Sequence, residues 1–212
     1  MGRYKFIIII ALIVLFGSCG RQKTVVNKYY IIDIPEIATT SPDDEVAFDD
    51  SYCKVNEIVI YPAYATRQIA NRRRSHELVY FENHAWAVRP QEVFTRVTID
   101  FLKKQKLFKD VSSRFWNVIP QYHLETTIYN LEVSEVEEDF SAHLQLEFRL
   151  VHAESNEAFL VHHADRSAPL DKRDLDLMAG EISRMYHEEL KILVIKIKDV
   201  LQQNESIQTM LN

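Results

Sequence analysis

Two stretches of alternating residues constrain the fold of this 212-residue chain more than any other feature. From Tyr122 to Ile128, and again from Ala142 to Leu150, every second residue belongs to a mainly apolar set, and polar residues lie between. Side chains of a β-strand point alternately to its two faces, so a period of two is typical of a sheet that buries one face. Glu157 to His163 is the third strand that we expect in this meander.

Two further segments repeat their apolar residues at helical spacing. Pro90 suits the first turn of a helix, and the repeat after it predicts a helix that ends near Lys106. Residues 173–203 carry a longer apolar stripe of the kind that usually packs on a core. We therefore predict an α+β fold, a mostly antiparallel sheet with two helices packed on one face.

The segment before Pro90 is rich in short extended runs. We expect strands at Tyr29 to Ile34, at Lys54 to Ile60 and at Glu77 to Phe81, and an edge segment at Asn83 to Arg89. An acidic stretch over residues 36–51 interrupts them, and its proline and paired aspartates predict a solvated loop.

The N-terminus has the features of a lipoprotein export signal. Two basic residues precede an apolar run over residues 6–16, which is far shorter than the roughly 20 residues that span a bilayer. The small residues Gly17-Ser18 then precede Cys19, the pattern that lipoprotein signal peptidase cleaves. We predict that residues 1–18 are removed and that Cys19 carries the lipid. An ordinary signal peptide with an incidental cysteine is the alternative.

The remaining 194 residues suffice for one domain. We expect a tether over residues 19–28, a single domain over 29–203 and a frayed tail over 204–212. After removal of two basic residues with the signal, 23 basic and 31 acidic residues remain, a net charge of −8. This balance argues against nucleic acid, and against a strongly anionic membrane, as the main partner.

The glycine content and the spacing of the histidines also argue against several kinds of binding and catalytic site. Gly180 is the only glycine after residue 20, and phosphate-cradling loops need several, so no nucleotide-binding loop can be assembled. His162 and His163 are adjacent and point to opposite faces of a strand, which argues against a shared metal ion. His187 begins an HExxH-like sequence, but Lys191 stands where the second histidine belongs. We predict no metal site, no cofactor and no enzymatic activity.

Two sets of residues are candidates for contacts with a partner. The first is a concentrated basic patch of Arg67, Arg72, Arg73 and Arg74. Guanidinium groups bind phospholipid phosphates or acidic protein patches, and the alternative is a loop that balances the acidic surface. The second is Trp86, which either lines an apolar groove or packs within the sheet. Cys53, the one thiol left once Cys19 is lipidated, is expected to be buried at the start of a strand, and an intermolecular disulfide is the alternative.

An ordered series of short motifs covers residues 67–111. It consists of Arg67-Gln68-Ile69-Ala70, Glu77-Leu78-Val79-Tyr80, Trp86-Ala87-Val88-Arg89-Pro90, a helix, and Leu107-Phe108-Lys109-Asp110-Val111. The series resembles the ABC-type transport auxiliary lipoproteins, the PqiC-like family. In that family an arginine-containing extended segment precedes an L-x-Y strand, a W-A-x-x-P turn, a helix and an F-x-x-V sequence. The acidic insert at 36–51 and the heavy basic run depart from the pattern.

The resemblance implies a role in transport. Family members are lipid-anchored periplasmic subunits of MCE-type systems, which move phospholipids or other hydrophobic molecules between the inner and outer membranes. The expected partners are an MCE-domain protein and, indirectly, an ABC permease and its ATPase. Gly20 is not the aspartate that retains some lipoproteins in the inner membrane, so we expect the outer membrane, facing the periplasm.

Two other functions stay open at this stage. One is a stand-alone envelope lipoprotein that scaffolds an outer-membrane assembly, and the other is a periplasmic protein that binds a small ligand. The anchor and the fold would suit either. A homo-oligomer is also compatible with an edge strand and an unusually long apolar helix.

Overall fold

A mixed β-sheet forms the centre of the computed structural model, which describes residues 27–33, 51–136 and 139–211. Cys19, the tether before residue 27 and most of the acidic stretch lie outside the described residues. The strands are β1 (Lys28–Tyr30), β2 (Tyr52–Val55), β3 (Val59–Ile60), β4 (Gln68–Arg74), β5 (Glu77–Trp86), β6 (Asp110–Ser112), β7 (Tyr122–Ser134), β8 (Ser141–His152) and β9 (Ala158–Pro169). The helices are α2 (Pro90–Gln105) and α3 (Leu175–Leu211).

Strand β7 is the axis of the sheet. Along one side it pairs in turn with β2, β3 and β4, all parallel to it, and along the other side with antiparallel β8. Strand β9 extends the sheet beyond β8, and β5 followed by β1 extends it beyond β4. The short strands β2, β3 and β4 therefore all pair with one edge of the long C-terminal meander.

The prediction of an α+β fold is confirmed, but the prediction of a mostly antiparallel sheet is only partly correct. Antiparallel pairing joins β7, β8 and β9, and also β4 and β5. The pairs β1–β5 and β2–β6, and the three pairs that β2, β3 and β4 make with β7, are parallel. Alternation shows which face a strand buries, whereas the direction of its neighbour depends on how the chain returns. The connection from β5 through α2 to β6 is one such return, and it places β6 beside β2 and parallel to it.

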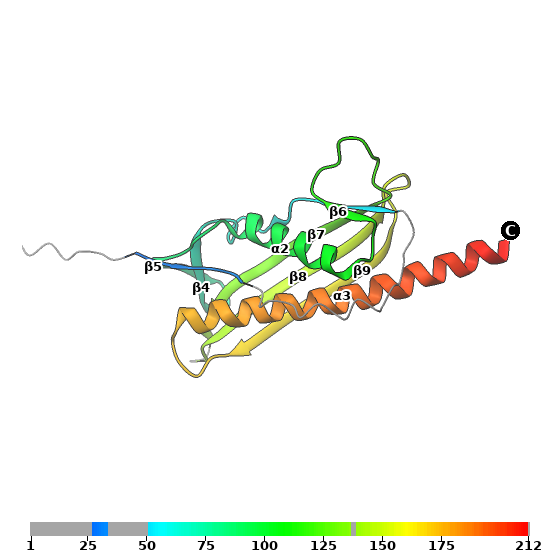
Figure 1. Cartoon of the computed structure of the whole chain (residues 1–212). Coiled ribbons are helices and arrows are strands. Elements are labelled where there is room, and N and C mark those ends of the chain that lie inside the picture. Colours follow the sequence, from blue (N-terminus) through cyan, green and yellow to red (C-terminus); the bar gives the residue numbers. More distant parts are fainter. Residues whose placement is uncertain (1–26, 34–50, 137–138, 212) are drawn as a thin grey trace, which may run out of the picture.

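Both helices lie on the same face of the sheet (Figure 1). Helix α3 packs on β8 and β9, and α2 packs against β2, β3, β6 and α3. Pro90 occupies the first turn of α2, and Lys106 ends the helix in the left-handed conformation, with its backbone N–H donating to the carbonyl of Lys103. Both ends agree with the sequence prediction.

The two helices contact each other through a buried aromatic pair. The rings of Phe94 and Tyr186 lie 4.5 Å apart, and the Tyr186 and Thr98 hydroxyls form a hydrogen bond of 2.6 Å. Most of the predicted apolar stripe of α3 is buried, including Met178, Ile182, Met185, Leu193 and Ile197. The helix continues past residue 203 to Leu211 and extends beyond the sheet (Figure 1).

Some strand bounds differ from those predicted. The run from Lys54 to Ile60 is divided into β2 and β3 by three intervening residues, and the Asn56 backbone N–H donates to the carbonyl of Leu124. The separate strand and edge segment expected over residues 77–89 are one strand, β5, which continues through Asn83 at a φ of 59°. Asparagine tolerates this left-handed conformation better than most residues.

Candidate partner-binding surface

The four arginines singled out in the sequence lie at or near β4, but they do not form one patch. Arg67 precedes the strand, and Arg72, Arg73 and Arg74 end it at the hairpin to β5. Arg72 follows Arg67 by five positions, about 16 Å at the usual rise of a strand. The sequence cluster is thus divided between the two ends of β4.

Arg72 is engaged within the protein. Its Nε donates to a carboxylate oxygen of Glu132 at 2.7 Å, and a terminal nitrogen donates to the Tyr64 hydroxyl at 2.6 Å. The Tyr64 hydroxyl in turn donates to the other oxygen of Glu132 at 2.6 Å. These three residues form a closed triangle of hydrogen bonds, so little of the Arg72 guanidinium is free to bind a partner.

Glu132 is the centre of a larger polar network on β7. Its side chain has no exposed surface, and it also accepts hydrogen bonds from Asn130 at 3.0 Å and from His143 Nδ1 at 3.2 Å. The other ring nitrogen of His143 lies 2.9 Å from a carboxylate oxygen of Asp165. A carboxylate oxygen therefore lies beside each ring nitrogen of His143, and both nitrogens must donate a hydrogen bond. A histidine ring donates from both nitrogens only in its protonated form, the imidazolium.

The electrostatics of the network agree with this assignment. Burial by itself would raise the pKa of Glu132, but the hydrogen bonds from His143, Arg72, Tyr64 and Asn130 outweigh it and lower that pKa to about 2. The hydrogen bond to Glu132 also raises the pKa of His143, against the opposing effect of burial. The pKa of Tyr64 is raised by burial and by Glu132. The network therefore holds a buried anion between two cations.

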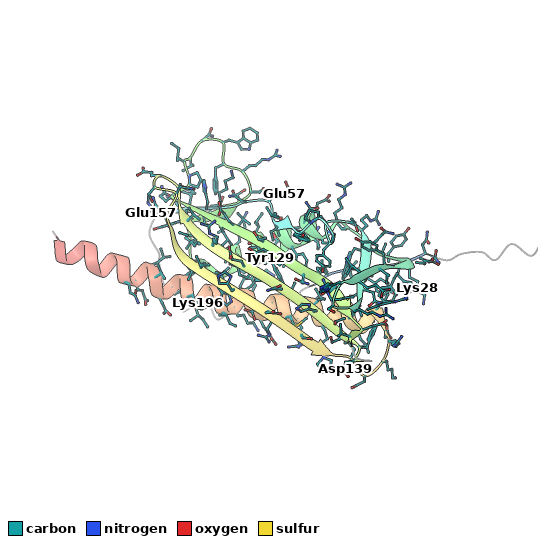
Figure 2. The ribbon with its side chains drawn as sticks, turned by 180° about the vertical axis from the view of Figure 1, so that it is seen from behind. Lys28, Glu57, Tyr129, Asp139, Glu157 and Lys196 are labelled. Atoms are coloured by element: carbon teal, nitrogen blue, oxygen red, sulfur yellow. The ribbon has the colours of Figure 1, made fainter. Side chains whose placement is uncertain are left out.

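This network lies on the face of the sheet that the helices leave uncovered. Glu132 and His143 alternate with buried residues such as Val133 and Leu144, which belong to the core on the side of α3. Figure 2, turned by 180° from Figure 1, shows that face toward the reader, with Tyr129 on it and α3 passing behind the strands. The network links β4, β7, β8 and β9 at that surface.

Arg67 and Trp86 lie at the other end of β4, beside β1. The Arg67 Nε donates to the backbone carbonyl of Trp86 at 2.9 Å, and its guanidinium carbon lies 5.4 Å from the centroid of the Tyr29 ring. Trp86 itself is only 2% exposed and lines a cavity of about 180 Å³ between β1 and α2, together with Ile32 and Val93. Trp86 thus supports this surface from below, whereas Arg67 and Tyr29 lie on it.

Arg73 and Arg74 are the exposed members of the arginine set at the hairpin. The Arg74 guanidinium lies 3.6 Å from Glu77, and 82% of its side chain is exposed. The described residues hold no carboxylate within ion-pair distance of Arg73, which leaves its charge available to a partner.

The polar network was missed by reasoning from sequence, although a signal for it exists. Glu132 and His143 are titratable residues in the middle of strands, and each lies on the polar face of its alternating pattern. Sequence spacing does not show that Tyr64, from the connection between β3 and β4, covers Glu132.

The histidine candidates are used in other ways. His162 is buried, with Nε2 2.7 Å from Glu189 and Nδ1 2.8 Å from the Lys196 ammonium, which joins β9 to α3. His163 faces the other way, with 70% of its side chain exposed, and lies 3.1 Å from Glu147. The prediction that these neighbours point to opposite faces is confirmed. Within the described ranges, no cluster of three or more histidine, cysteine or acidic side chains is arranged to hold a metal ion.

Cys53 lies in β2 and is completely buried, as predicted. Burial raises the pKa of its thiol to about 12, which makes it unreactive in the folded protein. None of the described helices has the length and hydropathy of a membrane span.

Comparison with solved structures shows that other proteins share this fold. A protein of family DUF330 from Xanthomonas campestris superposes with a TM-score of 0.69, at 14% identity over 84% of this chain and 99% of its own. A second, uncharacterized protein gives a TM-score of 0.63, at 13% identity over 81% of this chain and 99% of its own. At such low identity these similarities establish the fold alone. No curated protein matches the sequence.

The sequence itself matches a family model over residues 32–189, well over half of its length. The match includes β4, β5, α2 and β6, whose motifs carried the resemblance, together with the Glu132 network. The chain therefore belongs to the family of ABC-type transport auxiliary lipoprotein components.

Proposed function

We propose that this protein is a non-catalytic, lipid-anchored subunit of an MCE-type transport system that moves phospholipids or other hydrophobic molecules between the inner and outer membranes. Its membership of the auxiliary lipoprotein family is the observation that carries this proposal. In this role a permease and a cytoplasmic ATPase supply the energy, and the protein docks the MCE-domain conduit to the outer membrane. Cys19 would carry the lipid, and Gly20 after it favours the outer membrane, with the domain facing the periplasm.

The described surface supports docking to a partner protein. Exposed guanidinium groups are present at both ends of β4, and they suit an acidic surface on the conduit protein. Arg67, Arg73 and Arg74 are the residues that we assign to this contact.

A pull-down of the full-length lipidated protein from gently solubilised envelopes tests the proposal. Recovery of an MCE-domain protein with its permease and ATPase is the expected result. Recovery of an outer-membrane barrel or a secretin in their place would refute the transport role and favour a scaffold of an outer-membrane assembly. Recovery of no partner would also count against the proposal.

Charge reversal then tests the assigned surface. The triple variant Arg67→Glu, Arg73→Glu, Arg74→Glu is expected to lose the partner and to remain folded, because none of these side chains is buried. Arg72 must be left in place, since a negative charge there would face buried Glu132. Lys104→Glu, a charge reversal at an exposed lysine on α2, is the control for charge reversal elsewhere on the domain and should retain the partner. Equal recovery by both variants would remove the arginines from the interface.

A further inference from the structure

The loop between β6 and β7, residues 113–121, carries a concentration of exposed apolar side chains. Trp116 is 87% exposed, Ile119 82% and Val118 39%. Singly scattered apolar residues are normal on a protein surface, whereas three within four residues on one projecting loop indicate a contact site. Figure 1 shows the loop standing out from the body of the domain beyond β6.

The base of this loop is held on the sheet by specific contacts. The backbone N–H of Tyr52 donates to the Gln121 side chain at 2.7 Å, and the backbone N–H of Gln121 donates to the Tyr52 carbonyl at 3.0 Å. The Tyr52 ring meets Phe115 edge to face at 5.6 Å. Trp116 and Ile119 are thus presented to solvent by an anchored loop.

A cationic cavity lies beneath the exposed tip. Its volume is about 300 Å³, and its lining includes Lys54, Arg114, Phe115, Trp116, Pro120 and His123. Burial, and then the charge of Lys54, lower the pKa of His123, so the positive charge of this cavity comes from Lys54 and Arg114. Neither cation has a carboxylate partner among the described residues, and both can therefore bind an anionic group.

The small size of the protrusion decides which kind of partner fits it. A stable protein interface buries about 800 Å² on each side, far more than the tip of a nine-residue loop offers. A membrane surface needs only a few inserted apolar side chains, and tryptophan favours the boundary between lipid headgroups and acyl chains. Basic residues next to the inserted side chains contact the lipid phosphates.

We infer that residues 113–121 form a membrane-contact loop, which inserts Trp116 and Ile119 into a phospholipid bilayer while Lys54 and Arg114 bind lipid phosphates. This contact is distinct from the predicted lipid anchor. Lys28, where the described chain begins its first strand, lies at the opposite end of the domain from Glu157 and the loop (Figure 2). The inference goes beyond the proposed transport role and does not depend on the identity of the partner protein.

Tryptophan fluorescence tests the loop directly, because the chain has only two tryptophans and Trp86 is buried. The full-length lipidated protein is reconstituted into phosphatidylcholine vesicles. Phosphatidylcholine with brominated acyl chains is then placed either in the same vesicles or in added vesicles. Bromine quenches tryptophan on contact, so quenching together with a blue shift of the emission is expected in one of these two arrangements. Trp116→Phe, which leaves Trp86 alone, should abolish both signals.

Two further substitutions separate insertion from nonspecific contact. Ile119→Ser is expected to lower the equilibrium constant for insertion about tenfold, the effect of withdrawing one aliphatic side chain from an apolar environment. Ile195→Ser, at an isoleucine on α3 that is 59% exposed, is the control and should leave quenching unchanged. Reversal of both charges, Lys54→Glu with Arg114→Glu, should weaken insertion as well.

Absence of quenching in both vesicle arrangements would overturn the inference, and so would quenching that survives Ile119→Ser and the double charge reversal. Failure to recover an MCE-domain protein in the pull-down would refute the proposed function and leave the fluorescence result intact. The two proposals can therefore fail separately.

Discussion

Replacement of Glu132 by glutamine is the sharpest test of the structure, because one buried carboxylate accepts hydrogen bonds from Tyr64, Arg72, Asn130 and His143. Glutamine keeps the shape of the side chain but removes its charge, and its amide nitrogen adds a donor where four donors already converge. Arg72 and His143 would then lose the carboxylate that lies between them, and His143 would keep only Asp165 as a counter-charge.

The expected loss in free energy of unfolding follows from the pKa of Glu132. A decrease from the ordinary 4.5 to about 2 corresponds to roughly 3 kcal/mol of stabilisation of the folded state. Removal of one partner from a buried ion pair typically costs about 3–5 kcal/mol. We therefore expect Glu132→Gln to lower the free energy of unfolding by about 3–5 kcal/mol in urea titrations at pH 7.

Glu125→Gln is the matched control on the same strand. Glu125 lies 3.3 Å from Arg149, and more than a third of each side chain is exposed, so the expected loss is below about 1 kcal/mol. Equal losses for the two variants would refute the assignment of Glu132 as the centre of the network.

The pH dependence provides a second check with a defined sign. The pKa of Glu132 is depressed in the folded state, so its stabilisation is complete above about pH 4.5 and is lost as the pH falls towards 2. The gap in stability between the wild type and Glu132→Gln should accordingly shrink by about 3 kcal/mol over that range. A gap that stays constant under acid would contradict the reasoning.

Three other outcomes are expected. The thiol of Cys53 should resist alkylation at pH 8 until denaturant is added, because burial raises its pKa to about 12; rapid modification of the native protein would argue against its position in β2. Tyr186→Phe should cost about 1 kcal/mol in thermal unfolding through loss of the hydrogen bond to Thr98, whereas Tyr129→Phe, at an exposed tyrosine, should cost almost nothing. Cys19→Ala should abolish incorporation of labelled palmitate and release the protein from the membrane fraction, and continued incorporation would exclude Cys19 as the lipid site.

Much of the candidate surface was only partly predictable. The arginines at 72–74 were recognised as a basic cluster, but Arg72 turns out to be a structural residue that neutralises Glu132. Trp86 was expected either in a groove or in the sheet, and the structure buries it beneath a small cavity. The membrane-contact loop at residues 113–121 has no periodic pattern of apolar residues in the sequence. The exposure of Trp116 therefore becomes known only from the fold.

The amino-acid sequence was sufficient to predict both described helices, the long strands and the family of this protein. Local rules were sufficient for α2 and for the long strands, because the period of apolar residues and the position of Pro90 act within a few residues of chain. The family resemblance likewise depended only on the order of short motifs from Arg67 to Val111, and it required no knowledge of contacts between residues.

The parallel or antiparallel direction of each strand pair, and the side chains that meet, became known from the folded structure. Tyr64 and Arg72 precede Glu132 by 68 and 60 residues. Their convergence with Glu132 and His143 depends on the pairing of β4 and β8 with opposite sides of β7. Alternation specifies the face of a strand and leaves its neighbours undetermined. The polar network and the exposed loop therefore belong to the fold as a whole, because burial and charge pairing depend on contacts between distant segments.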